Sequence, residues 1–128
     1  MISYFSKYDV NILLFAAPTD IEKAKKIIDN EKLISAETTF DRMTAVIKQL
    51  DFLFSPDTSV VHIASGFNIP VFGIYINYNT DNIVWYPYNT KHELVVTEKP
   101  TLNELAFDTV INKLKIFFEQ IYYGKRNP

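Results

Sequence analysis

With 128 residues, 48% of them hydrophobic and 22% charged, the chain has the size and composition of one globular domain with a hydrophobic core. The net charge of −2 lacks the basic excess of nucleic-acid-binding proteins, and the absence of cysteine excludes disulfides, zinc–thiolate sites and thiol catalysis. No apolar run approaches the roughly 20 residues of a membrane span, and the first residues lack a secretion-signal pattern, so we expect a soluble cytoplasmic protein.

Short apolar runs alternate with amphipathic segments along the chain. The first run is continuously apolar, as in a strand buried on both faces, and the Pro18-Thr19-Asp20 sequence after it opens a helix. The expected strands are residues 11–17, 32–35, 51–55, 70–75 and 93–96. The expected helices are residues 18–30, 41–50, 58–67 and a long one that starts at Thr101 and closes at Gly124, Lys125 and Arg126.

Strands that alternate with helices at this spacing predict an α/β fold. Its sheet should be parallel, with right-handed crossovers and helices on both faces. The third helix should take Asp57 as its N-cap and end at Gly66 or Asn68. The glycines of the chain are too few and too far apart for a G-x-G-x-x-G turn or a phosphate-binding P-loop.

A polar cluster after the third strand is the main candidate site. Asp57, Thr58 and Ser59 stand where this strand ends and the third helix begins, and His62 follows one turn later. In open parallel sheets, ligands bind at the carboxyl ends of the strands, and a helix that starts there offers free N–H groups and a positive dipole end. Location and residue types therefore predict a phosphorylated ligand.

Each residue of the cluster also has a structural explanation. Asp57 could be a helix cap alone, and because a carboxylate repels phosphate, it suits sugar hydroxyls or loop orientation better. Thr58 and Ser59 are residue types that commonly begin helices. A lone histidine on a helix, such as His62, is more often structural than ligand-binding. From the residues alone, both interpretations stay open.

The cluster belongs to a longer ordered motif. The motif reads Asp57-Thr58-Ser59-x-x-His62, then Ala64, Ile69-Pro70-Val71 and Gly73. It resembles the donor-binding signature of glycosyltransferase family 9, the ADP-heptose:lipopolysaccharide heptosyltransferases. The resemblance implies a Rossmann-like fold, a pyrophosphate held by Thr58, Ser59 and His62, and a role for Asp57 at the sugar or in the loop. It also implies metal-independent chemistry, in keeping with a sequence that has no D-x-D.

Three further residues are candidates. The resemblance places Asp20 near the ribose of the donor, although an acid at a helix start is favourable by itself. The family's Gly-Gly pair before this residue is Ala16-Ala17 here, which restricts close approach of the nucleotide. Thr38 could border the nucleobase or lie in a solvated loop. Trp85 could fold over the sugar pocket or cover the end of the sheet.

The resemblance covers only part of the family's two-domain GT-B architecture. Residues 1–128 resemble the C-terminal, donor-binding domain without its first strand and helix. The acceptor domain, which carries the catalytic base in this family, has no counterpart, so no catalytic residue is assigned. The missing strand would lie beside residues 51–55, and we expect the two halves of the sheet to pair directly or the chain to dimerise through unpaired edges.

The implied reaction is transfer of a heptose-like sugar from ADP-heptose to a lipopolysaccharide core acceptor, with inversion. It would occur at the inner face of a bacterial inner membrane, with peripheral membrane association, and no nucleic acid is expected as a partner. The chain alone should bind the donor without catalysing transfer. Two alternatives stay open: a non-catalytic nucleotide-binding or interaction module, and a GT-B enzyme that uses a UDP-sugar.

Overall fold

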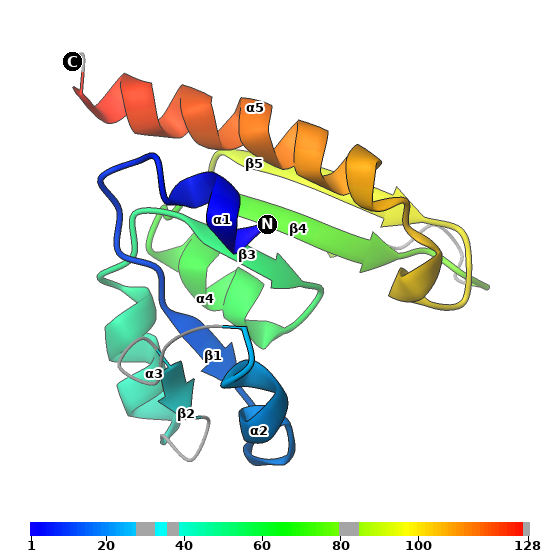
Figure 1. Ribbon diagram of the computed structural model, residues 1–128, viewed down its shortest axis with the longest axis horizontal. Helices are drawn as coiled ribbons and strands as arrows, with labels where there is room; N and C mark the ends of the chain where they lie inside the picture. The colour runs from blue at the N-terminus through cyan, green and yellow to red at the C-terminus, as the bar shows by residue number, and fades with distance from the viewer. Residues whose placement is uncertain (28–32, 36–38, 80–84, 127–128) are drawn as a thin grey trace. The chain divides into compact units, whose positions relative to one another are not determined.

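The structure, a computed structural model, describes residues 1–27, 33–35, 39–79 and 85–126. The chain divides into two compact units, Met1–Ala45 and Val46–Pro128, and each contains its own sheet (Figure 1). The Asp57–His62 cluster belongs to the second unit, whereas Asp20 belongs to the first.

The first unit is built around a short parallel sheet. Strands β1 (Leu14–Ala16) and β2 (Leu33–Ser35) pair in register, with Leu14 opposite Leu33. The unit also contains α1 (Ile2–Phe5), η1 (Pro18–Asp20), α2 (Ile21–Ala24) and the start of α3 (Phe40–Ile47). The first predicted strand is thus confirmed but shorter, and the helix predicted from Pro18 begins as a 3₁₀ turn.

The second unit contains a three-stranded parallel sheet in the order β3-β4-β5. Its elements are β3 (Leu53–Pro56), α4 (Ser59–Gly66), β4 (Val71–Ile76), β5 (His92–Thr97), η3 (Leu102–Glu104) and α5 (Phe107–Arg126). In the pairing of β3 with β4, Ser55 stands opposite Gly73. The α/β class and the parallel sheet predicted from the sequence are confirmed.

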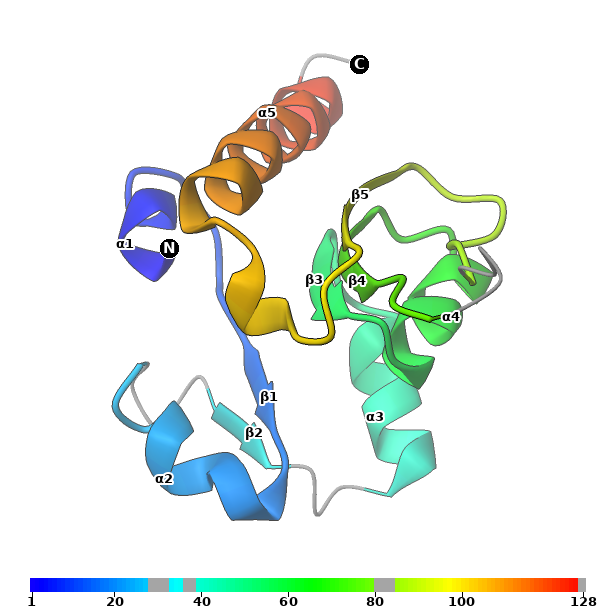
Figure 2. The same ribbon diagram turned by 90° about the vertical axis from the view of Figure 1, so that its right-hand side faces the viewer.

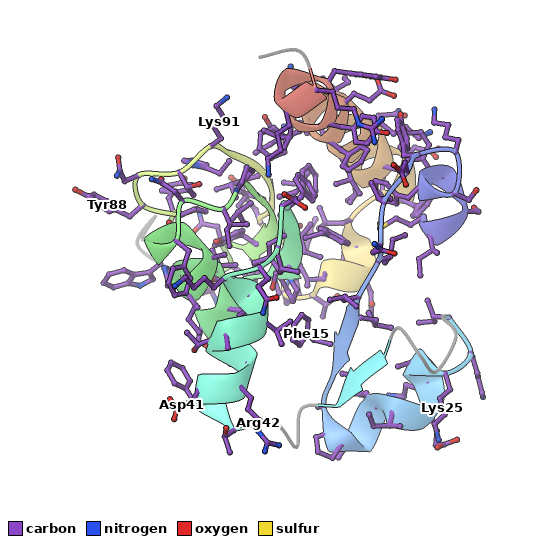
Figure 3. The ribbon with its side chains drawn as sticks, turned by 90° about the vertical axis from the view of Figure 1, so that its left-hand side faces the viewer. Phe15, Lys25, Asp41, Arg42, Tyr88 and Lys91 are labelled. Carbon is purple, nitrogen blue, oxygen red and sulfur yellow. The ribbon has the colours of Figure 1, made fainter. Side chains whose placement is uncertain are left out.

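Helices cover both faces of this sheet (Figure 2). Helix α5 packs on the face that carries Phe72, whose ring centroid lies 6.5 Å from that of Phe117. Helix α4 packs against β3 and β4 on the opposite face, where it buries Val61 and Ala64 completely. Because side chains alternate along a strand, Tyr75 points away from α5, toward the α4 face. Shortly before β5, the exposed side chains of Tyr88 and Lys91 are directed outward (Figure 3).

Helix α4 ends in a Schellman motif. The Ile69 N–H donates to the Ala64 carbonyl at 3.0 Å, and the Asn68 N–H donates to the Ser65 carbonyl at 3.0 Å. Asn68 takes the left-handed conformation that this motif requires, with φ of 61°. Of the two predicted terminators, Asn68 is therefore the one that ends the helix.

The long C-terminal helix differs from the prediction at both ends. It begins at Phe107 instead of Thr101, because η3 comes first and Leu105, with φ −72° and ψ 124°, is extended. It continues through Gly124 to Arg126, so Gly124 is a helix residue and not a cap. Lys125 and Arg126 do lie in the last turn, where positive charge favours the helix dipole.

Closure of the sheet concerns how the two units associate. In the described ranges, β1–β2 and β3–β4–β5 belong to separate sheets, and direct pairing of the two halves stays a prediction. On the outer edge of β3, Pro56 has no N–H to offer a further strand. Dimerisation through sheet edges stays a prediction.

Candidate functional site

The predicted cluster lies at the carboxyl edge of the second sheet. Strand β3 ends at Pro56 and α4 begins at Ser59, so Asp57 and Thr58 make the whole connection. The Asp57 N–H donates to the Ile74 carbonyl at 3.0 Å, which attaches this connection to the central strand. Since all three strands are parallel, the connection stands at the edge where ligands of open α/β sheets bind.

Thr58, and not Asp57, is the N-cap of α4. The hydrogen bond from Asp57 to Ile74 extends the β3–β4 ladder by one residue, which delays the start of the helix. Thr58 has the extended backbone of an N-cap, with φ −146° and ψ 169°, but its side chain makes no capping hydrogen bond. The prediction that Asp57 caps this helix is therefore wrong, and its carboxylate is not used as a cap.

The four residues of the cluster share one property, which is exposure. Asp57, Thr58, Ser59 and His62 all lie on the solvent side, whereas Val61 between them is fully buried. Ser59 and His62 are three residues apart on α4 and therefore lie on neighbouring positions of one helix face. The fold thus brings the hydroxyls, the imidazole and the helix N-terminus together in water, where a ligand can reach them.

Two residues behind the loop were missed by sequence reasoning. Ser55 is only 5% exposed, and its hydroxyl lies 3.3 Å from that of Thr58. Tyr75 is fully buried, and its hydroxyl has no hydrogen-bond partner in the part of the chain that the structure describes. In the sequence, Ser55 and Tyr75 could have been found as polar side chains within otherwise apolar strands, because a buried polar group needs a hydrogen-bond partner.

Burial, with a smaller contribution from the charge of Asp57, raises the pKa of Tyr75 to about 12. A raised folded-state pKa means that the phenol stays neutral in the folded protein while it ionises in the unfolded chain. The stability that depends on a neutral Tyr75 phenol is intact below pH 10.0, the ordinary pKa of tyrosine. It is lost as the pH rises toward the folded-state pKa of about 12.

We expect Tyr75→Phe to remove this alkaline loss. Near neutral pH the variant should be at least as stable as the original chain. The substitution removes a buried hydroxyl that has no hydrogen-bond partner among the described residues. Urea denaturation of both proteins at pH 8 and at pH 11 measures the difference. If the two stability curves stay parallel from neutral to alkaline pH, Tyr75 ionises equally in both states and the prediction is wrong.

Asp20, Thr38 and Trp85 are the remaining predicted site residues. Asp20 accepts a hydrogen bond from the Lys23 ammonium at 2.8 Å, and this bond with the charge of Asp20 raises the pKa of Lys23. Thr38 lies outside the described residues. Trp85 is 69% exposed, which suits ligand contact better than cover for the end of the sheet. Asp20 stands in the first unit, so its role at the nucleotide stays a prediction.

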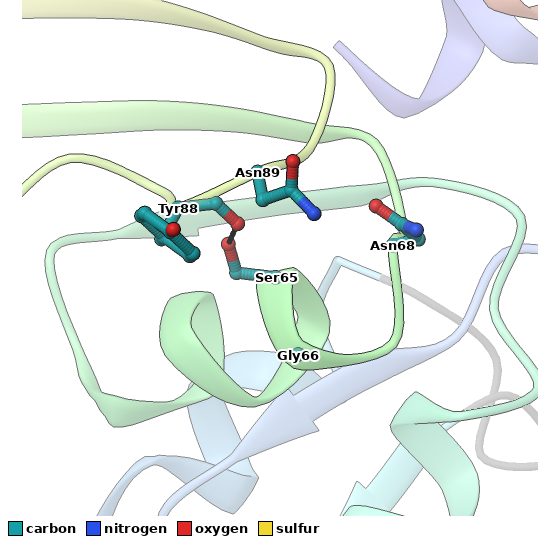
Figure 4. A pocket seen from close by; sticks show the side chains of 5 residues that line it. All are labelled: Ser65, Gly66, Asn68, Tyr88 and Asn89. Carbon is teal, nitrogen blue, oxygen red and sulfur yellow. Dashed lines mark hydrogen bonds between the residues drawn. The ribbon is translucent and has the colours of Figure 1, made fainter.

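A surface pocket of about 290 Å³ lies at the other end of α4 (Figure 4). Its lining residues are Ser65, Gly66, Asn68, Tyr88 and Asn89. The Ser65 hydroxyl is already engaged, since it donates to the Tyr88 carbonyl at 2.5 Å. The pocket is therefore distinct from the predicted cluster, which lies at the opposite end of the helix.

Among the described residues, no group of three or more His, Asp or Glu side chains is placed to hold a metal ion. None of the described helices is long and apolar enough to cross a membrane.

Residues 2–114 match the family described as Glycosyltransferase family 9 (heptosyltransferase). The chain belongs to glycosyltransferase family 9. Within that match, the residues predicted to bind the donor, Asp57, Thr58, Ser59 and His62, lie on the β3–α4 connection and the first turn of α4.

Two relatives are lipopolysaccharide heptosyltransferases by name. The chain is 31% identical over 75 residues to a protein of Escherichia coli (strain K12) designated as a proposed lipopolysaccharide heptosyltransferase 4, covering 56% of this chain and 21% of that protein. It is 27% identical over 95 residues to the lipopolysaccharide core heptosyltransferase OpsX of Haemophilus influenzae, covering 70% of this chain and 27% of that protein. This member of the family thus matches only about a quarter of these relatives.

A solved structure has the same fold. The crystal structure of a glycosyl transferase family 9 protein from Veillonella parvula DSM 2008 superposes with a TM-score of 0.67 at 14% sequence identity. The superposition covers 94% of this chain and 39% of that one. Nearly all of this family 9 chain therefore has the fold of one part of that protein.

Proposed function

We propose that this chain binds the diphosphate of a nucleotide sugar at the N-terminus of α4. The observation that carries the proposal is the position of the family motif, at the carboxyl edge of a parallel sheet and on the first turn of a helix. Free N–H groups and the positive end of the helix dipole favour a phosphate there. The exposure of Thr58, Ser59 and His62 supports direct contact with it.

Within this site the residues take different roles. Ser59 donates its hydroxyl and Thr58 its backbone N–H to the pyrophosphate, and the His62 imidazole stabilises charge on the departing nucleotide. Asp57 contacts sugar hydroxyls, because a carboxylate beside a phosphate would repel it. Asp20, Thr38 and Trp85 are the proposed contacts of the ribose, the base and the sugar.

The proposed reaction is transfer of a heptose-like sugar from ADP-heptose to a lipopolysaccharide core acceptor, with inversion. It is supported by family membership and by the names of the two relatives. The chain's part of the reaction is to position the donor and to stabilise developing charge, which are large contributions in transfer enzymes. The acceptor and the base belong to a second domain, and the reaction takes place on the cytoplasmic side of the inner membrane.

Thermal unfolding with ADP, ADP-heptose and UDP tests the proposal. A ligand at 100 times its dissociation constant should stabilise the chain by about 2.7 kcal/mol, which is a visible rise in Tm. Ser59→Ala and His62→Ala should each weaken ADP binding by about tenfold, since each removes a hydrogen bond to a charged group.

Matched controls are available on the same chain. His92→Ala removes the other histidine, which is exposed at the start of β5, and Thr109→Ala removes an exposed hydroxyl of α5. Both variants should bind ADP normally. A Tm that no nucleotide changes would contradict the proposal and favour a non-catalytic interaction module. A shift with UDP alone would favour an enzyme that uses a UDP-sugar.

A further inference from the structure

Ser55 is a buried hydroxyl on the α4 face of β3. It lies on the same face as Leu53, two residues earlier, and both side chains are buried, at 5% and 7% exposure. The residues on either side of Ser55 point to the other face and are exposed. A hydroxyl at such a position is stable only when it is hydrogen-bonded, so its partners indicate what it does.

The hydrogen bonds of Ser55 determine the direction in which Thr58 donates. The Ser55 hydroxyl donates to the Pro56 carbonyl at 2.8 Å and lies 3.3 Å from the Thr58 oxygen. A hydroxyl has one proton. Because the Ser55 proton is used on Pro56, the proton between the two hydroxyls belongs to Thr58, which donates to Ser55.

In this arrangement the Thr58 oxygen lies beside Ser55 and does not cap its own helix. An N-cap threonine normally accepts a hydrogen bond from an N–H group of the first helical turn. The Thr58 side chain makes no such bond, and the N–H groups of Ser59 and Val60 have no partner in the described ranges. The first turn of α4 is therefore left open for an outside acceptor.

We propose that Ser55 is a positioning residue, which holds the Thr58 hydroxyl away from the first turn of α4 and so keeps the N–H groups free for a phosphate. The inference rests on the proposed function, since it concerns the same site. Without Ser55, the Thr58 oxygen would turn to the N–H groups and compete with the ligand for them.

The variant Ser55→Ala tests this role. Its dissociation constant for ADP, measured by calorimetry, should rise about threefold to tenfold, which is the effect of one capping oxygen that competes for the same donors. The Tm without ligand should not fall, because the released Thr58 now caps the helix. A merely structural role would lower the Tm together with the affinity.

A substitution of Thr58 provides the matched control. A valine side chain has no oxygen that could compete, so Ser55→Ala combined with Thr58→Val should bind ADP as Thr58→Val alone does. Three-bond couplings of Thr58 in the nuclear magnetic resonance spectrum should also show a changed χ1 rotamer in Ser55→Ala.

Each negative result has its own meaning. Unchanged ADP affinity in Ser55→Ala, or an unchanged Thr58 rotamer, would overturn this inference while leaving the proposed function in place. An additive loss in the double variant would overturn it as well. Absence of ADP binding by the unaltered chain would overturn the proposed function and this inference with it.

Discussion

Phe72→Ala is expected to lower the free energy of unfolding by about 3–5 kcal/mol, the usual cost of truncating a fully buried phenylalanine. Phe72 lies on the central strand with no exposed surface. Its ring packs between Phe54 and Phe117, at centroid distances of 5.6 and 6.5 Å, and thereby joins β3, β4 and α5. Domains are stable by only about 5–15 kcal/mol, so this loss is a large fraction of the total. Urea denaturation measures it.

Phe107→Ala is the matched control for this prediction. Phe107 is 58% exposed at the start of α5, so the same truncation removes little buried surface. Its effect should stay within about 0.5 kcal/mol, as for most surface substitutions. Equal losses in the two variants would mean that the aromatic cluster between β4 and α5 is not the core of the second unit.

Gly73→Ala is expected to destabilise the chain by about 3 kcal/mol, the upper part of the range for overpacking. A methyl group on Gly73 would overlap the Tyr75 ring and would lie 2.7 Å from a Leu94 methyl group. Both contacts are far below van der Waals distance, so the ring of Tyr75 must move. The position needs glycine for space and not for backbone conformation, because its φ is not positive.

The effect of Gly73→Ala should also reach the proposed site. Gly73 stands opposite Ser55, and the neighbouring Ile74 carbonyl holds the Asp57 N–H. Displacement of β4 would therefore move the loop, and ADP affinity should fall together with stability. Calorimetry with ADP under conditions where the variant is still folded measures this second effect.

Gly66→Ala is the control in this case. A methyl group on Gly66 would meet no atom within 4 Å, and the residue lies in α4. Alanine in a helix is better than glycine by about 0.5–1 kcal/mol, so this variant should gain stability. A loss of similar size in both variants would contradict the steric explanation for Gly73.

Much of the second unit was predictable from local patterns. Apolar runs predicted β3 and β4 to within one or two residues, and the polar residues between the third strand and the third helix predicted the candidate site. The strands and the start of α4 were predicted closely because a strand buried in a parallel sheet must be apolar, and because Thr and Ser are frequent where helices begin. The family motif added the proposed type of ligand, and the site itself stays a prediction.

Other features could not be read from local patterns. The start of α4 depends on the hydrogen bond from Asp57 to Ile74, which joins residues that only the β3–β4 pairing brings together. The long helix starts late because η3 packs against β4 before α5 can begin. In both cases a contact with another strand overrides the capping preference of the nearby sequence.

The sequence by itself determined the α/β class, the family and the location of the candidate site at the end of β3. Only the tertiary structure decided that Thr58 occupies the N-cap position of α4, that its hydroxyl is bound to Ser55, and that Tyr75 needs the space above Gly73. The physical reason is the range of the interactions. Hydrophobic periodicity and helix starts depend on neighbours in sequence, whereas hydroxyl partners and packing depend on strands that meet only in the folded sheet.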